Sequence, residues 1–428
     1  MNVPIQLFHC PSAVNGLHIK RQLQILAILL IIGLLPSLTA AATIDLELPK
    51  TGLTAEELAV VVNDDDPQSL AIAEYYRVKR GIPEANILHV HFASNGPNLP
   101  QSTFNRIRNA VLGQTRPNIQ AYALAWTKPY RVDCMSITSA FSFGFDKDYC
   151  SKTLCAPTKA SEYFDSPSHT PFDSHGIRPS MLLAGNTLAE VKRLIDRGVA
   201  SDHRYPTHTG YLLNTRDKER SVRAAFFPET IKVLGQAFHL VRLDADQIID
   251  KQDVLFYFTG LKQVEGLQTL HFVPGAIADH LTSAGGILDG KDQMSSLRWL
   301  EAGATGSFGA VVEPCNHVQK FPIPAVVMGH YAMGDTLIEA YWKSVAWPGE
   351  GVFIGEPLAH PFAPSLVDVH EDGATLKLFS PIRREAQLQG SESIMGPYLP
   401  VTRYPVFPGL NEINIHLPDK NQHYRMIL

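Results

Sequence analysis

The sequence lacks the short motifs that mark the commonest α/β enzymes. Its 428 residues hold no Gly-x-Gly-x-x-Gly fingerprint and no Gly-x-x-x-x-Gly-Lys-Ser/Thr loop, so we expect no bound nucleotide and no cofactor. No Gly-x-Ser-x-Gly nucleophile elbow occurs either, which disfavours a typical α/β-hydrolase.

Neither sign of charge is in excess. The chain carries 37 Lys and Arg against 42 Asp and Glu, a formal net charge of −5. A nucleic acid partner would require a basic surface, so we expect none. Hydrophobic residues make up 45% and charged residues 18%, a globular composition that excludes a disordered or fibrous chain. The length predicts about two domains, since one domain holds roughly 100–200 residues.

Long hydrophobic runs are also scarce. One run, Leu23–Leu35, follows Lys20 and Arg21 and precedes small residues that end at Ala42. A basic start, a short apolar core and a small-residue exit are the parts of a secretory signal, whereas a spanning helix needs about 20 residues. We therefore predict a signal peptide over 1–42, a secreted or periplasmic protein, and no membrane span after cleavage. An uncleaved signal anchor is the alternative.

Cysteine is rare, with five residues in all, and Cys10 falls in the signal. The remaining Cys134, Cys150, Cys155 and Cys315 are an even number in an oxidising compartment, which predicts structural disulfides whose pairing stays open. A zinc site is the weaker interpretation, because the spacing matches no ribbon or finger, and we predict no metal.

Apolar strand patterns and helix patterns alternate from about residue 55 to 362. Strands without alternating polarity, separated by helices, predict a doubly wound, mostly parallel α/β sheet covered on both faces. We assign this domain to 43–365, with an insertion at about 140–180. The expected strands are 58–63, 87–92, 121–126, 211–214, 239–243, 253–260, 269–275 and 307–315, and the expected helices are 69–80, 104–112, 188–197, 220–235, 295–303 and 336–345.

The pattern changes at about residue 366. The segments 375–381, 386–390 and 411–417 alternate between apolar and polar residues and are separated by Pro and Gly, with no helical stretch between them. Such segments predict β-strands, so we assign 366–428 to a small β-rich appendage.

Polar residues gather just after the expected strands. In an open parallel sheet, ligands bind outside the carboxyl ends of the strands, so these residues predict a strand-end site. If the segment 275–286 were helical, His280 would lie one turn from Ser283. The predicted site comprises Asn63, Asp64, Thr259, Gly260, Asp279, Ser283, Glu313 and His317.

Cys315 is the candidate nucleophile, since thiolate chemistry needs an exposed sulfur beside a basic partner. His317 would point to the opposite face of an extended backbone, so His280 or His271 would have to act as the base. The alternative is a Cys315 that packs in the interior or pairs with Cys134.

Five long motifs stand out: VVVNDDDPQSLAIAEYYRVKRGIPEANIL, YLLNTRD, PGAIADHLTSAGG, AGATGSFGAVVEPCNHVQKFP and FIGEPLAHPF. Together they resemble an uncharacterised family of exported bacterial proteins, found in genomes that carry exosortase sorting systems. The resemblance covers nearly all of the chain between the signal and about residue 362. It implies export but no established activity.

The segments DTLIEAYWKSV and FIGEPL, with the order of the last strands, resemble the gingipain-like cysteine peptidases more remotely. That resemblance implies a caspase-like sheet followed by an immunoglobulin-like domain. In that family a His-Gly follows one strand and the nucleophilic Cys follows the next. These places fall on Thr259-Gly260 and near Pro274-Gly275, where neither catalytic side chain is present. The resemblance therefore implies the fold without the catalytic dyad.

Three hypotheses follow. The first is an exported, non-peptidase binding or accessory protein of the cell envelope, whose partner is an envelope or exopolymer component or a peptide. The second is a hydrolase, a cysteine peptidase that uses Cys315 with His280 or His271. The third is a structural surface protein stabilised by its disulfides.

Overall fold

The computed structural model describes residues 45–428, except 95, 154, 371 and 419–422. The predicted signal peptide, with Lys20, Arg21 and Leu23–Leu35, lies outside the described residues. Ile44–Leu428 form one compact unit. None of the helices within the described ranges combines the length and the apolar character that crossing a membrane requires.

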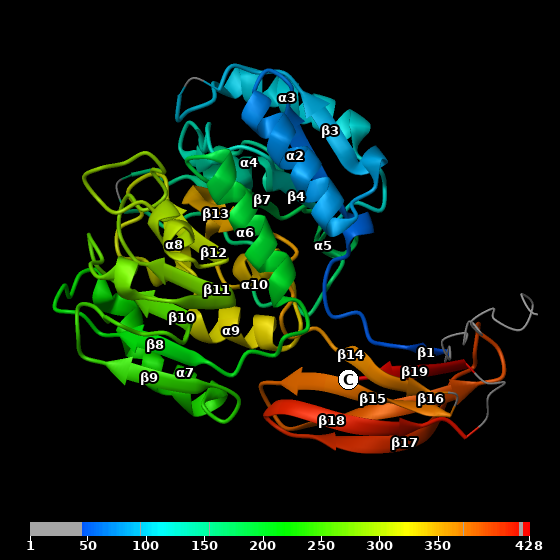
Figure 1. Cartoon of the computed structure of the whole chain (residues 1–428). Coiled ribbons are helices and arrows are strands. Elements are labelled where there is room, and N and C mark those ends of the chain that lie inside the picture. The colour runs from blue at the N-terminus through cyan, green and yellow to red at the C-terminus, as the bar shows by residue number, and fades with distance from the viewer. Residues whose placement is uncertain (1–44, 95, 154, 371, 419–422) are drawn as a thin grey trace, which may run out of the picture. The chain divides into compact units, whose positions relative to one another are not determined.

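A sheet of ten strands, in the order β3-β2-β4-β7-β13-β12-β11-β10-β8-β9, forms the centre of this unit (Figure 1). Most neighbouring strands are parallel, so the predicted α/β class with a mostly parallel sheet is confirmed. The strands are β2 Leu58–Asn63, β3 Ile87–Val90, β4 Ala121–Leu124, β7 Ser180–Leu182, β8 Thr209–Leu213, β9 His239–Leu243, β10 Val254–Thr259, β11 Phe272–His280, β12 Gly306–Ala310 and β13 Gly351–Gly355.

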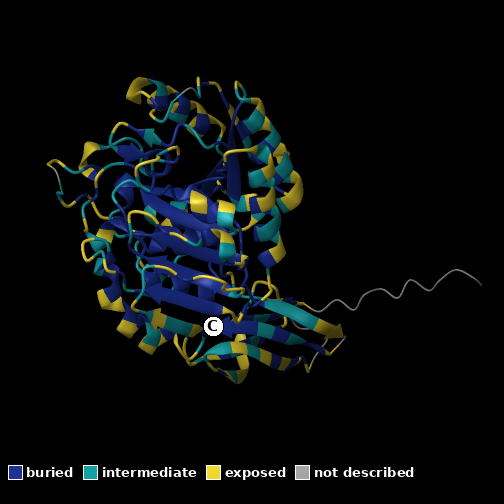
Figure 2. Cartoon of the chain, turned by 60° about the vertical axis from the view of Figure 1, so that its left-hand side comes forward, coloured by how far each residue is buried: buried dark blue, intermediate teal, exposed yellow. Residues whose placement is uncertain are grey.

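Helices cover both faces of the sheet. In Figure 2 the strands of this sheet are coloured as buried, and the helices that cover them are partly exposed. Val60 and Val62 of β2 belong to one buried cluster, and Ala59 and Val61 to another. Because successive strand residues point to opposite faces, β2 is buried on both sides. The helices are α2 Pro67–Arg80, α3 Gln101–Gln114, α4 Ile137–Phe143, α5 Pro171–His175, α6 Leu188–Ser201, α7 Phe227–Leu234, α8 Leu297–Ala302, α9 Pro324–Ala332 and α10 Leu337–Lys343.

The direction of the strands reverses once across the sheet. β12 and β13 pair antiparallel, whereas β13 pairs parallel with β7, and β11 parallel with β12. The carboxyl ends of β2, β3, β4, β7 and β13 therefore lie at one edge, and those of β8 to β12 lie at the opposite edge. This reversal divides the residues of the predicted strand-end site between two edges.

β11 is longer than its sequence pattern indicates. Val254 lies opposite Phe272, but Phe256 lies opposite Ile277, so the strand carries an irregularity near Pro274 and Gly275. Gly275 has a positive φ of 87° there. The expected strand ended at this Pro-Gly pair, which is a bulge within β11 and not its end. Residues 276–280 are therefore strand, and His280 is not one helical turn from Ser283.

The C-terminal strands form two further sheets, in the orders β14-β15-β18 and β1-β19-β16-β17. Leu376, Leu388, Ile415 and Met426 belong to their shared core. The sequence patterns did not predict β1, which comes from the other end of the described chain and pairs parallel with β19. These strands are β1 Leu46–Glu47, β14 Ser365–His370, β15 Gly373–Ser380, β16 Arg384–Ser391, β17 Leu399–Val406, β18 Gly409–His416 and β19 His423–Ile427.

Candidate functional site

The structure does not bring Asn63 and Asp64 to the other residues of the predicted strand-end site. Both lie at the carboxyl end of β2, at the edge opposite to the ends of β10, β11 and β12. The buried Asn63 side chain donates from Nδ2 to the Phe92 carbonyl, 2.9 Å away, and accepts from the Phe92 amide at 3.1 Å. Asp64 Oδ1 lies 2.7 Å from Nδ1 of His89. These contacts join the ends of β2 and β3.

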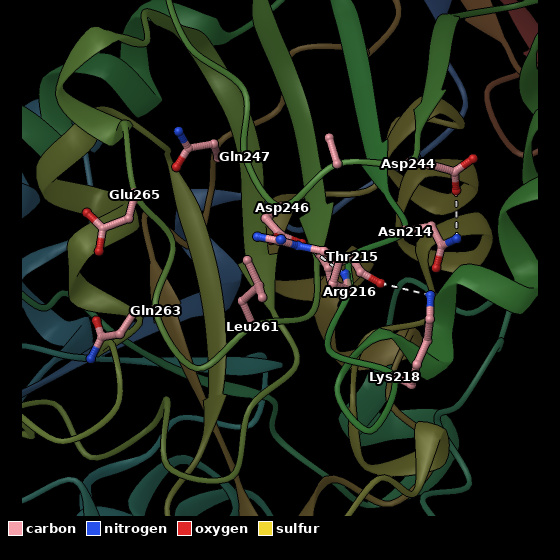
Figure 3. Close-up of a pocket in the computed structure, with 11 residues that line it drawn as sticks. Asn214, Thr215, Arg216, Lys218, Asp244, Asp246, Gln247, Leu261, Gln263 and Glu265 are labelled. Atoms are coloured by element: carbon pink, nitrogen blue, oxygen red, sulfur yellow. Dashed lines mark hydrogen bonds and ion pairs between the residues drawn. The ribbon is translucent and has the colours of Figure 1, made fainter.

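The edge where β8 to β12 end holds two open pockets. The larger has a volume of about 830 Å³ and lies among the loops that follow β8, β9 and β10 (Figure 3). β8 and β10 are neighbours in the sheet, and their connections diverge. The loop after β8 leads to β9 on one side of this pair, and the loop after β10 leads to β11 on the other side. Such a switch point is where ligands bind in open α/β sheets. This polar pocket is lined by Asn214, Thr215, Arg216, Lys218, Asp244, Ala245, Asp246, Gln247, Leu261, Gln263 and Glu265.

Several charges in the polar pocket are paired within its wall. The Arg216 guanidinium contacts Oδ2 of Asp246 through Nε at 2.7 Å, and the Arg216 amide donates to Oδ1 at 2.9 Å. This amide and the guanidinium lower the pKa of Asp246 from its usual value. Asn214 Nδ2 donates to Asp244 at 2.7 Å. The wall therefore offers the amide groups of Gln247 and Gln263 beside charged groups, of which Arg216, Asp244 and Asp246 already have partners.

The second pocket, of about 380 Å³, brings four of the predicted site residues together: Ser283, Glu313, Cys315 and His317. It lies where the loop after β8 meets the ends of β11 and β12. We call it the Cys315 pocket. Its other lining residues are Cys155, Glu219, Arg220, Leu281 and Asn316.

Cys315 forms a disulfide with Cys155, and Cys134 forms one with Cys150. The sulfur of Cys315 is therefore bonded, and the alternative pairing with Cys134 does not occur. The Cys315 amide donates to Oε1 of Glu313 at 2.8 Å, and Nε2 of His317 lies 2.7 Å from the Cys155 carbonyl. Nucleophilic attack by Cys315 would first require reduction of this disulfide.

His280 is buried beneath the strand ends, and both of its ring nitrogens are engaged. Nε2 lies 3.0 Å from the Met294 carbonyl, and Trp299 Nε1 donates to Nδ1 at 2.9 Å. Burial lowers the pKa of His280 to about 3, so its ring is neutral at pH 7. His271 precedes the first residue of β11 and lies at the opposite edge of the sheet. Neither histidine is arranged as a base for Cys315.

Asp279 also points inward and forms an ion pair with Arg223, with Nη1 2.6 Å from Oδ1. Arg223 lies in the 3₁₀ helix η4 (Ser221–Phe226) and donates from Nη2 to the Thr259 carbonyl at 2.8 Å. Burial raises the pKa of Asp279, and the charge of Arg223 opposes that rise. The pair therefore holds η4 against the ends of β10 and β11, below both pockets.

Gly260 allows this close approach. A Cβ atom at Gly260 would lie 1.9 Å from the carbonyl oxygen of Arg220, so only glycine fits there without a backbone shift. The segment that ends at Arg220 separates the polar pocket from the Cys315 pocket.

The residues of the polar pocket were missed from sequence, although a signal existed. YLLN and HLVRL were both expected as strands, and Asn214 and Asp244 lie directly at their ends. The strand-end rule that selected Thr259 and Glu313 applies equally to these two residues. Glu219 and Arg220 carried no such signal, because they lie farther along the loop.

Within the described ranges, no group of three or more His, Cys, Asp or Glu side chains is arranged to hold a metal ion.

No protein-family model and no curated protein matches the chain. Among solved structures, one titled as a protease aligns with 88% of this chain and 97% of its own, at 9% identity and a TM-score of 0.45. The complex of the pro- and mature domains of RgpB, a gingipain from Porphyromonas gingivalis, aligns with 85% of this chain and 94% of its own, at 9% identity and a TM-score of 0.40. At these TM-scores neither likeness carries an argument about the activity.

Proposed function

We propose that the protein is an exported, non-peptidase binding or accessory protein of the cell envelope. Its ligand binds at the edge where β8 to β12 end. The observation that carries the proposal is the disulfide between Cys155 and Cys315, together with the engagement of both nitrogens of His280. The two disulfides also support an oxidising compartment. The same proposal includes the removal of a signal peptide over 1–42. It also includes two domains, 43–365 and 366–428.

The ligand of the polar pocket is an uncharged, hydrogen-bonding polymer such as an exopolymer component. The pairing of Arg216 with Asp246 supports this chemistry, because it leaves the amide groups of Gln247 and Gln263 in the wall beside Lys218 and Glu265, one charge of each sign. Among the described residues, no aromatic side chain lines this pocket, and Leu261 is the one large apolar residue in its wall. A pocket of that composition favours hydroxyl-rich or amide ligands over apolar ones.

Binding of exopolysaccharide purified from the producing cells tests the proposal. The exported protein should bind it in calorimetry, and the double variant Gln247→Ala/Gln263→Ala should bind about 10-fold or more weakly, since each lost hydrogen bond costs about 1 kcal/mol. Gln268→Ala is the matched control, because Gln268 is exposed and does not line the pocket. Equal binding by all three proteins would refute the site. Binding of casein peptides instead would assign the pocket to a peptide.

The cysteine peptidase is the second candidate, because Cys315 lines an open pocket together with His317 and Glu313. Alkylation of the exported protein under non-reducing conditions reports whether Cys315 carries a free thiol. A Cys315 that is alkylated without reduction, in a protein that cleaves casein before alkylation but not after it, would support the peptidase over the binding protein, provided that Cys315→Ser cleaves no casein. A Cys155–Cys315 peptide recovered intact, with no cleavage, supports the binding protein.

A further inference from the structure

A third pocket, of about 440 Å³, lies away from the strand ends. Its lining contains four basic side chains, Lys50, His169, His330 and Arg384, and one acidic side chain, Asp335. We call it the Arg384 pocket. Its residues come from the segment before β2, the loop before α5, helix α9 with the turn after it, and strands β16 and β19.

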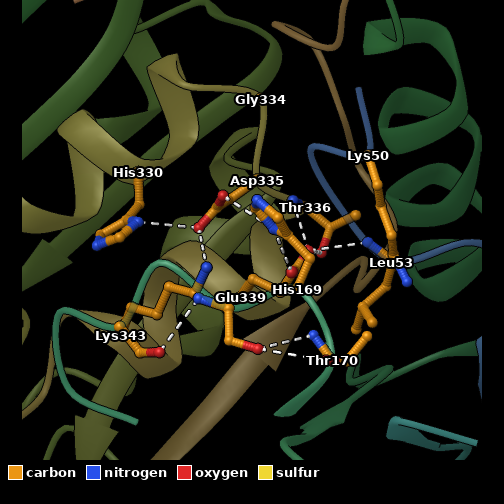
Figure 4. A network of polar contacts seen from close by, with 12 residues as sticks. Lys50, Leu53, His169, Thr170, His330, Gly334, Asp335, Thr336, Glu339 and Lys343 are labelled. Carbon is orange, nitrogen blue, oxygen red and sulfur yellow. Dashed lines mark hydrogen bonds and ion pairs between the residues drawn. The ribbon is translucent and has the colours of Figure 1, made fainter. Parts of the chain in front are cut away.

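The negative charge of Asp335, the acidic side chain of this pocket, is already balanced by a neighbouring lysine. Asp335 is buried, and its Oδ2 lies 2.7 Å from Nζ of the buried Lys343 and 3.0 Å from Nδ1 of His330 (Figure 4). Lys343 supplies the full positive charge that balances Asp335, whose Oδ1 also lies 3.4 Å from Nδ1 of His169, so Asp335 leaves no charge for Arg384.

His169 is held by a second buried acid. Its Nδ1 lies 3.1 Å from Oε1 of Glu339, and the other carboxylate oxygen, Oε2, accepts from the Leu53 amide at 2.9 Å. Burial would raise the pKa of Glu339, but His169 and Lys343 outweigh it and lower the pKa to about 2. Glu339 is therefore ionised, and it fixes the imidazole of His169 at the pocket wall.

Arg384 has no such partner. Its side chain makes no hydrogen bond or ion pair with any described residue, and its Nε and Nη2 atoms are enclosed by protein, which leaves Nη1 as the nitrogen that a ligand can reach. The side chain is partly buried, and this burial lowers the pKa of its guanidinium. A guanidinium partly removed from water without a counter-charge is unfavourable, and an anion at the exposed side of Arg384 would offset part of that cost.

The remaining wall is largely apolar, with Met333, Met426 and Ile427 among its residues. We propose that the Arg384 pocket binds an organic carboxylate that bears an apolar chain. The carboxylate lies at the basic wall beside Arg384, and the chain packs on Met333, Met426 and Ile427. The volume suits a small ligand, since ligand pockets span about 300–1,000 Å³.

Calorimetric titration of the exported protein with hexanoate tests this inference. Arg384→Gln should weaken hexanoate binding at least 10-fold, whereas the matched control Arg383→Gln should leave it unchanged. Arg383 is exposed and stacks at 5.3 Å over the ring of Phe407. Because Arg384 has no partner within the described residues, its substitution should leave the thermal midpoint near that of the wild type, which circular dichroism checks. Equal weakening by both variants, or none by Arg384→Gln, would overturn the assignment.

Two ligand controls and one further variant complete the test. If hexanol bound as tightly as hexanoate, Arg384 would not be recognising a carboxylate. If acetate bound as tightly as hexanoate, the apolar wall would not be contributing to binding. Either result would contradict the proposal. Leu428 also lines the pocket. Hexanoate binding that appeared only after removal of Leu428 would mean that the chain fills its own pocket, and would overturn the proposal.

Discussion

Asp279 and His280 are neighbours at the end of β11, yet their side chains have opposite electrostatic roles. Successive strand residues point to opposite faces, so Asp279 reaches Arg223 while His280 reaches Trp299. The first is a buried charge with a partner, and the second is a buried ring kept neutral. Both side chains are about 1% exposed. We therefore expect each of them to affect the stability of the fold and not the chemistry of a pocket.

His280 makes stability depend on pH. Its folded-state pKa is about 3, and an unfolded histidine has a pKa of about 6.5. A depressed folded-state pKa means that only the unfolded chain binds the proton as pH falls through 6.5, so stability is lost on acidification. We expect the free energy of unfolding to fall by about 2 kcal/mol between pH 7 and pH 5 through this group, at 1.36 kcal/mol per pKa unit.

Urea unfolding of the wild type and of His280→Gln at both pH values measures this effect. The variant is expected to be less stable at pH 7 and to lose about 2 kcal/mol less than the wild type on acidification. A fall of the same size in the two proteins would assign the pH dependence to other groups.

At the scale of single elements, continuous apolar strands were predictable and short ones were not. LAVVVN forms β2 as expected, whereas β7 has three residues and β13 carries glycine at both ends. The direction in which a strand runs is not encoded in a local sequence pattern, so the reversal at β13 could not be predicted. That reversal separates Asn63 from Glu313, although the two obey the same strand-end rule. Ser283, Glu313, Cys315 and His317, which were predicted from strand ends and from thiol chemistry, line one pocket.

Gly260 tests how the end of β10 shapes the two pockets. Gly260→Ala places a Cβ within 1.9 Å of the Arg220 carbonyl, so the loop must move. We expect a loss of about 1–3 kcal/mol in urea unfolding and weaker exopolysaccharide binding. Gly113→Ala is the matched control, since Gly113 lies in α3 with no atom near its Cβ position. It should raise stability by about 0.5–1 kcal/mol. A Gly260→Ala protein as stable as the wild type would contradict the close approach.

At the scale of the whole molecule, contacts between distant segments hold the described chain together. Cys155 and Cys315 are 160 residues apart, whereas Cys134 and Cys150 are separated by 16. β1 pairs with β19, and the ring of Phe379 in β15 stacks 5.1 Å from Phe238, which follows α7. Such long-range contacts leave no local pattern in the sequence, which explains why β1 and the disulfide pairing were not predicted.

The two disulfides should contribute different amounts to the free energy of unfolding. Closing a longer loop removes more entropy from the unfolded chain, and the loop-entropy relation gives about 5 kcal/mol for Cys155–Cys315 against about 3 kcal/mol for Cys134–Cys150. We expect Cys155→Ser/Cys315→Ser to lower the free energy of unfolding more than Cys134→Ser/Cys150→Ser, as urea titrations measure. The reverse order would mean that local packing, and not loop length, sets the contribution.

Phe379 tests whether the described chain unfolds as one unit. Its buried ring also contacts Phe362, at 4.6 Å between centroids, and lies in the same core as residues of β2 and β10. Phe379→Ala should cost about 3–5 kcal/mol through the cavity it leaves. Because Ile44–Leu428 form one compact unit, far-ultraviolet and near-ultraviolet circular dichroism should report one transition in both proteins. A variant in which the two signals separate would show that the β-strands after residue 365 lose their structure independently of the ten-stranded sheet.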